Sequence, residues 1–83
     1  MTVHLSGYRY LEVVPGRRGG KPVVKGTRVT VEDIVESLAA GWSVDEVAEQ
    51  FNIPRDAVLE ALRYVAELLR RTNVIVTEEA ISG

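Results

Sequence analysis

Basic side chains gathered before residue 30 are the groups in this sequence with the clearest binding chemistry. The densest cluster is Arg17, Arg18, Lys21, Lys25 and Arg28. Guanidinium and ammonium groups pair with phosphates or carboxylates, so this stretch predicts contact with one of them. Residues 1–30 carry six cations and one acid, a net charge of +5, whereas residues 31–83 carry four cations and eleven acids, a net charge of −7. Two explanations stay open: an arm that binds nucleic acid, or an arm that folds onto acidic helices of its own body or of a partner chain.

Groups suited to catalysis or metal binding are sparse. His4 is the sole histidine and the sequence has no Cys, so neither a nucleophile–base pair nor a ligand cluster is visible. Gly20 and Lys21 could end a phosphate-binding loop, but Pro15 and Pro22 occupy positions where that motif needs Gly and a hydroxyl. The sequence also lacks an apolar run of membrane-spanning length and a signal-peptide pattern. We therefore expect a cytoplasmic, non-enzymatic protein with no cofactor, no metal and no membrane partner.

Residues 41–62 form the segment that must position these cations, and they predict two helices. Ser43 and Glu46 have the spacing of a capping box, in which each side chain accepts a hydrogen bond from the other residue's amide. Trp42 precedes the cap, where it can pack on Val47 as a buried hydrophobic staple. The pattern predicts a helix that starts just after Ser43.

The turn and the preceding helix are marked by similar signals. Asn52 tolerates the left-handed conformation of a helix end, and Pro54 suits the first turn of the next helix. Thr30 and Asp33 predict the start of an earlier helix, which Gly41 ends. Three helices with a tight second turn predict a helix-turn-helix, and an ordinary helical corner is the alternative.

The remaining segments predict short strands. Residues 8–14 and 23–29 are rich in β-branched and aromatic side chains and flank a glycine-rich basic turn, so they predict a hairpin. Residues 73–77 predict a last short strand, and residues 1–7 are expected to fray. A hairpin is only marginally stable alone, so this one must dock on the helices or on a second chain.

The third helix, predicted over residues 55–71, has too much apolar surface for a single core. Its apolar side chains spread over an arc of about 180°, whereas packing on one core needs about 100°. The excess predicts a symmetric dimer, with cover by the hairpin or the last strand as the alternative. The predicted dimer residues are Leu59, Ala66, Leu68 and Leu69.

The polar side of that helix is poorly suited to contact DNA. Its first turns hold Arg55 but also Asp56 and Glu60, whose charges repel phosphates. If DNA is bound, the basic arm must supply most phosphate contacts, helped by Arg55 and Arg63.

A resemblance adds to these patterns. It is carried by the string Gly20-Lys21-Pro22-Val23-Val24-Lys25-Gly26-Thr27-Arg28-Val29, and by Leu38-Ala39-Ala40-Gly41-Trp42-Ser43 after it. Over about residues 8–69 the chain resembles a bacterial and archaeal family known as domain of unknown function 433, often grouped with VapB-type antitoxins. The resemblance implies a homeodomain-like helical fold, dimerisation, and neutralisation of a PIN-like ribonuclease toxin encoded nearby. The chain departs from the family in having Pro54 where Thr or Ser is usual.

Residues of this motif also have a structural interpretation. Gly26 would supply a special backbone conformation, while Lys21 and Arg28 would pair with acidic helix faces. The motif therefore does not by itself choose between a binding role and a structural one.

Together these observations predict one domain over residues 1–83 of the mainly α (α+β) class. We expect a three-helix, homeodomain-like helix-turn-helix at 30–71, an N-terminal β-hairpin arm at 8–29, and a short C-terminal strand and tail at 72–83. The leading hypothesis is a DNA-binding antitoxin and transcriptional regulator of a type II module, which forms a homodimer and binds duplex DNA and a PIN-like toxin. The alternative is a dimeric protein-interaction adaptor that does not bind DNA.

Overall fold

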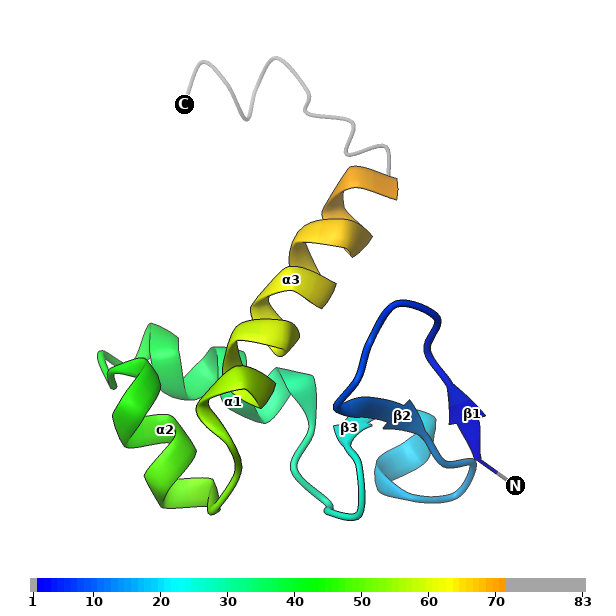
Figure 1. Cartoon of the computed structure of the whole chain (residues 1–83), viewed down its shortest axis with the longest axis horizontal. Helices are drawn as coiled ribbons and strands as arrows, with labels where there is room; N and C mark the ends of the chain where they lie inside the picture. The colour runs from blue at the N-terminus through cyan, green and yellow to red at the C-terminus, as the bar shows by residue number, and fades with distance from the viewer. Residues whose placement is uncertain (1, 72–83) are drawn as a thin grey trace.

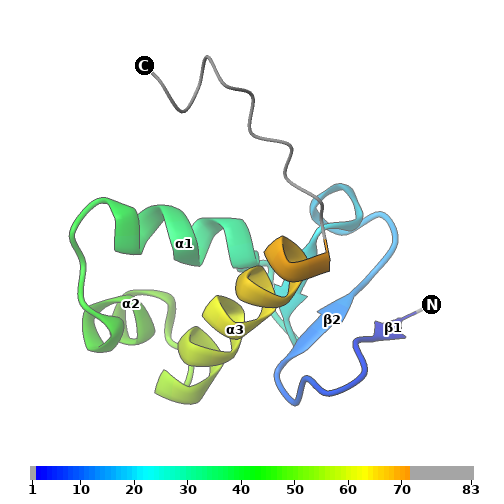
Figure 2. The same cartoon turned by 90° about the horizontal axis from the view of Figure 1, so that it is seen from above.

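The structure is a computed structural model that describes residues 2–71 of the chain, and the predicted strand at 73–77 lies outside these residues. Three short strands come first: β1 (Val3–His4), β2 (Leu11–Val13) and β3 (Pro22–Val24). Three helices follow: α1 (Val31–Ala39), α2 (Val44–Phe51) and α3 (Arg55–Arg71). The small sheet lies on one side of α3, and α1 and α2 lie on the other (Figures 1 and 2). The predicted α+β class is confirmed.

The strands form an antiparallel sheet in the order β1-β2-β3. Leu11 pairs with Val24 across β2 and β3, as a hairpin requires, and Val3 pairs with Val13 across β1 and β2. The expectation that residues 1–7 fray is therefore wrong over Val3–His4. Leu5, just after β1, packs against the core and anchors the segment.

One hydrophobic core joins the sheet to the helices. Leu11, Ile34, Val47 and Val58 are fully buried and come from β2, α1, α2 and α3 respectively. The remaining buried members of this cluster are Val24, Val31, Ile53, Ala57 and Ala61. Burial of each Leu, Ile or Val side chain contributes about 1.5–3 kcal/mol relative to exposure, which makes this shared core the main stabilising element.

The helix boundaries follow the local signals. Thr30 and Asp33 form a complete capping box at α1, and Ser43 and Glu46 form a second one at α2. Asn52 adopts the left-handed conformation, with φ 54° and ψ 50°, at the C-terminal end of α2. The predicted turn between α2 and α3 is confirmed, and α3 begins directly after Pro54.

The predicted role of Trp42 as a buried staple is wrong. Its side chain is 41% exposed and lies outside the core, whereas Val47 is fully buried without it. Trp42 instead lines a surface hollow with Glu46, Glu49 and Gln50. Within residues 2–71, none of the helices is long and apolar enough to cross a membrane.

Candidate interaction surfaces

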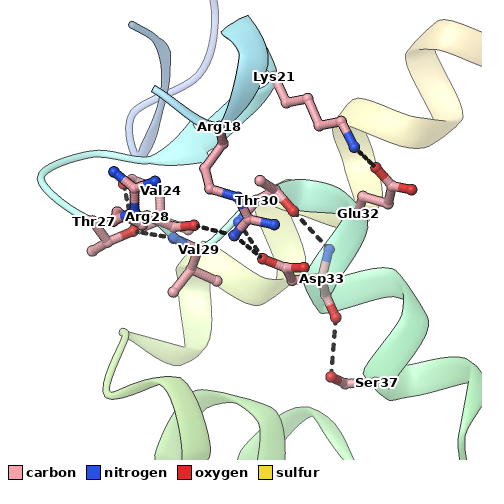
Figure 3. A network of polar contacts seen from close by, with 10 residues as sticks. All are labelled: Arg18, Lys21, Val24, Thr27, Arg28, Val29, Thr30, Glu32, Asp33 and Ser37. Atoms are coloured by element: carbon pink, nitrogen blue, oxygen red, sulfur yellow. Dashed lines mark hydrogen bonds and ion pairs between the residues drawn. The ribbon is translucent and has the colours of Figure 1, made fainter. Parts of the chain in front are cut away.

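Three of the five cations between Arg17 and Arg28 pair with carboxylates of the same chain. Arg18 donates to Asp33 on α1 at 3.1 Å, and Lys21 donates to Glu32 on the same helix at 2.7 Å (Figure 3). Arg17 lies 3.6 Å from Glu12 of β2. The arm therefore folds onto an acidic helix of its own body, which is one of the two explanations that its charge left open.

Asp33 is the centre of this network. It caps α1 through Thr30 and also accepts from Arg18, whose guanidinium binds the main-chain carbonyl of Arg28 at 2.9 Å. Partial burial raises the pKa of Asp33, but hydrogen bonds from Thr30 and the Arg18 charge outweigh it. The pKa of Asp33 therefore lies below the ordinary aspartate value. This carboxylate holds the arm against the first turn of α1.

Lys25 and Arg28 differ from the other arm cations. Both side chains are exposed, and neither forms an ion pair within residues 2–71. The structural interpretation of the motif thus fits Lys21 but not the Arg28 side chain. Within the described residues, Lys25 and Arg28 are the two members of the Arg17-to-Arg28 cluster that stay exposed without an ion pair.

The two α3 cations predicted to help bind DNA also have contacts inside the chain. Arg55 donates to Asp45 at the start of α2, at 2.8 Å. Arg63 donates to the Gly7 carbonyl at 2.7 Å, and its guanidinium lies 4.4 Å from the centre of the Tyr8 ring. Arg55 therefore connects α3 to α2, and Arg63 connects α3 to the segment between β1 and β2.

Glu60 is a structural residue that sequence reasoning missed. We expected it on the open side of α3, but its side chain is only 9% exposed. Its carboxylate accepts hydrogen bonds from the main-chain amides of Arg9 and Tyr10, at 3.0 and 2.6 Å. Because these amides point to Glu60 and not to a neighbouring strand, β2 begins later than predicted, at Leu11. Helical periodicity carries no signal for a contact made fifty positions away.

The predicted dimer residues are exposed on α3. Leu59, Leu68 and Leu69 are 40%, 43% and 61% exposed, and Ala66 is exposed as well. Leu62, which was not predicted, is 38% exposed. Cover by the hairpin is therefore wrong for the described residues, and cover by the last strand lies outside them.

These exposed residues do not form one surface. Leu68 lines an apolar groove of about 340 Å³ between α3, α1 and β3, here called the groove. Its other lining residues are Lys21, Pro22, Val31, Glu32, Val35, Glu36, Tyr64 and Val65. Leu59, Leu62, Ala66 and Leu69 follow a separate stripe along α3, here called the α3 seam. The chain thus offers two apolar surfaces where one was predicted.

The sequence model of a family described as "Protein of unknown function (DUF433)" matches residues 11–65. The chain belongs to the DUF433 family. The match runs from β2 through most of α3 and includes most of the arm, the capping boxes and Glu60. It ends before Ala66, Leu68 and Leu69, so the exposed last turns of α3 lie beyond the family match.

Two known proteins are similar to this DUF433 chain. The uncharacterized protein y4eO of Sinorhizobium fredii (strain NBRC 101917 / NGR234) is 54% identical over 35 residues, which cover 42% of this chain and 16% of y4eO. The X-ray crystal structure of Rv2018 from Mycobacterium tuberculosis aligns with a TM-score of 0.57 and 33% identity. That alignment covers 63% of this chain and 24% of Rv2018. The chain therefore spans less than a quarter of either relative's length.

Proposed function

We propose that this DUF433 domain is a protein-interaction module that binds a partner protein in the groove and acts without binding DNA. The observation that carries the proposal is the groove itself, an open apolar hollow flanked by the exposed Leu68. Apolar grooves of this kind are where amphipathic helices and other partner segments dock in known recognition modes. The surrounding charges favour the same conclusion, because most of the cations predicted to bind DNA are paired within the chain.

The electrostatics of the helices point to a basic partner. Residues 31–71 carry nine acids and four cations, and four of these acids are exposed with no ion pair within residues 2–71: Glu36, Glu46, Glu49 and Asp56. An acidic surface of this kind associates with a positively charged one and repels phosphates. A ribonuclease has a basic surface because it must bind RNA. We therefore propose that the partner is the PIN-like ribonuclease toxin that the family resemblance implies, with the domain as its cytoplasmic antitoxin.

The test is co-expression with the product of the neighbouring reading frame, followed by purification through a tag on that product. We expect the parent chain to co-purify with the tagged product and the Leu68→Glu variant not to. Binding in the groove would bury the introduced carboxylate among apolar side chains, which is unfavourable. The matched control is Val3→Glu, at an exposed apolar residue of β1 outside the groove. Retention of Leu68→Glu at the parent level would remove the groove from the interaction.

DNA binding by a transcriptional regulator is the second candidate. It is favoured by the accessible charges of Lys25 and Arg28, and by the confirmed turn between α2 and α3. A promoter fragment titrated at several salt concentrations separates the two candidates. Each neutralised phosphate contributes a slope of about 0.9 in the logarithm of affinity against the logarithm of salt. We expect no such binding from the parent chain. The regulator would be established instead if the parent chain bound DNA in a salt-dependent way and the slope became smaller in the double variant Lys25→Ala, Arg28→Ala.

A further inference from the structure

The α3 seam has the spacing of a coiled-coil interface. Leu59, Leu62, Ala66 and Leu69 are separated by three, four and three residues, which is the alternation that brings one stripe of a helix against another helix. All four side chains are exposed, whereas other residues of α3, including Val58 and Ala61, are buried in the core. The helix therefore carries a second apolar stripe beside the one that is buried.

The charges along one edge of the seam indicate what could cover it. Asp56, Arg63 and Arg70 recur every seven residues on that edge. Asp56 is exposed, with no ion pair within residues 2–71, and Arg70 pairs only with Glu67 of its own helix, at 2.9 Å. Asp56 lies near one end of this edge and Arg70 lies near the other. A second copy of α3 that runs antiparallel would therefore place its Arg70 beside Asp56 and its Asp56 beside Arg70.

We propose that two copies of this chain associate through their α3 seams in an antiparallel pair. In this arrangement Leu59 meets Leu69 of the second copy, and Leu62 meets Ala66 of the second copy. Asp56 then lies beside Arg70 of the second copy, and the symmetry repeats this ion pair at the other end. A parallel pair would place each seam residue against its own counterpart and would bring no opposite charges together.

Two features of the monomer suit this pairing. The last turns of α3 extend beyond α1 and α2, so a second helix can approach them (Figure 1). Arg63 would lie near the symmetry axis and face its counterpart, but its contacts with Gly7 and Tyr8 hold it back against its own chain. The seam spans about three turns, which is a small interface, and we expect a roughly micromolar dissociation constant.

The groove lies outside the seam, so this inference and the proposed function can fail separately. Sedimentation of the full chain without any partner should show a monomer–dimer equilibrium. Asp56→Arg alone, or Arg70→Asp alone, should weaken association by about tenfold, because each creates two like-charge contacts. The double variant Asp56→Arg, Arg70→Asp should restore it, since the charges are exchanged between the ends. A strict monomer at every concentration, or a double variant weaker than both single ones, would overturn the proposal.

A cross-linking experiment tests the orientation even if a charge variant folds poorly. The parent sequence has no Cys, so an introduced pair reports without background. An oxidised mixture of Leu59→Cys chains and Leu69→Cys chains should form the mixed dimer, and each chain alone should form little. Efficient cross-linking of Leu59→Cys with itself would indicate a parallel pair and contradict the antiparallel one.

Discussion

Two buried glutamates hold the N-terminal segment in place, one from the sheet and one from α3. Glu12 accepts a hydrogen bond from the Gly26 amide at 3.2 Å, and Glu60 accepts from the amides of Arg9 and Tyr10. Buried main-chain amides need acceptors, and leaving one unpaired costs about 1–3 kcal/mol. These two acids therefore serve the fold, although their charge alone would suggest a solvent-exposed surface.

Glu60→Gln should lower the free energy of unfolding by about 1–3 kcal/mol, because one carboxylate oxygen becomes an NH₂ group that cannot accept. Urea denaturation measures the change. Glu67→Gln, seven residues further along α3, is the matched control and should stay within about 0.5 kcal/mol. Equal effects of the two substitutions would mean that the amides of Arg9 and Tyr10 do not depend on Glu60.

The lowered pKa of Asp33 makes its contribution depend on pH. A carboxyl group with a lower pKa in the folded state stabilises the fold above its unfolded pKa, and that stabilisation is lost as the pH falls through the folded value. Asp33→Asn should therefore be less stable than the parent at neutral pH, and the difference should shrink in acid. Urea denaturation at a series of pH values checks this. A difference that stays constant down to the most acidic pH would show that the Asp33 charge is not the cause.

Trp42 and Val47 provide a contrast in burial. Trp42→Ala should lower the free energy of unfolding by only about 1 kcal/mol, because its ring is partly exposed; truncation of a fully buried aromatic costs about 3–5 kcal/mol. Val47→Ala should cost more than Trp42→Ala, although it removes fewer atoms, since Val47 is fully buried. Thermal unfolding of both variants measures which one loses more stability. A larger loss in Trp42→Ala than in Val47→Ala would support the buried-staple interpretation of Trp42.

At the scale of elements, the α2–α3 turn depends on one unusual backbone conformation. Asn52 has a φ of 54°, in the left-handed region where a Cβ is unfavourable and Asn is tolerated better than Ala. Asn52→Ala should destabilise the protein by about 1 kcal/mol, whereas Asn52→Gly should not, because Gly adopts this conformation freely. Denaturant unfolding of the two Asn52 variants measures how much the left-handed conformation of this turn contributes to stability. Equal loss in both variants would instead assign the effect to the lost Asn side chain.

The elements that the sequence predicts well are those whose signals are local. The capping boxes at Thr30 and Ser43 act over three residues, so the starts of α1 and α2 could be identified from the sequence. The strand β1 has only two residues, and its place depends on pairing with β2 and on the packing of Leu5. Neither contact is visible in a local pattern, which is why fraying was predicted there.

The candidate surfaces were predictable only in part for the same reason. Helical periodicity identified the excess apolar arc of α3, including Leu59 and Leu69. It could not separate Leu68 from them, because the groove exists only where Val35 of α1 and Pro22 of β3 come to lie beside α3. The arm's charge likewise could not say that Lys21 would find Glu32, since that pairing depends on how the arm docks.

At the scale of the whole molecule, the charge asymmetry is partly neutralised by folding. The basic arm lies against α1, whose first turn holds Glu32 and Asp33, so two of its cations pair with acids of that helix. The exposed Lys21–Glu32 pair should contribute little to stability, about 0–1 kcal/mol. Its effect is mainly on what the surface can bind, because paired cations attract phosphates less strongly.

The hydrogen bonds from Arg9 and Tyr10 to Glu60 join segments that are fifty positions apart along the chain. Because Glu60 lies on α3, these bonds exist only while the N-terminal segment and α3 are docked on each other, so the packing of one depends on the packing of the other. The native state should show the same coupling in hydrogen exchange. The Arg9 and Tyr10 amides lie outside any strand, yet their hydrogen exchange should be as slow as that of the amides in the buried half of α3. Opening of this segment would break both hydrogen bonds and leave the buried Glu60 carboxylate without these donors.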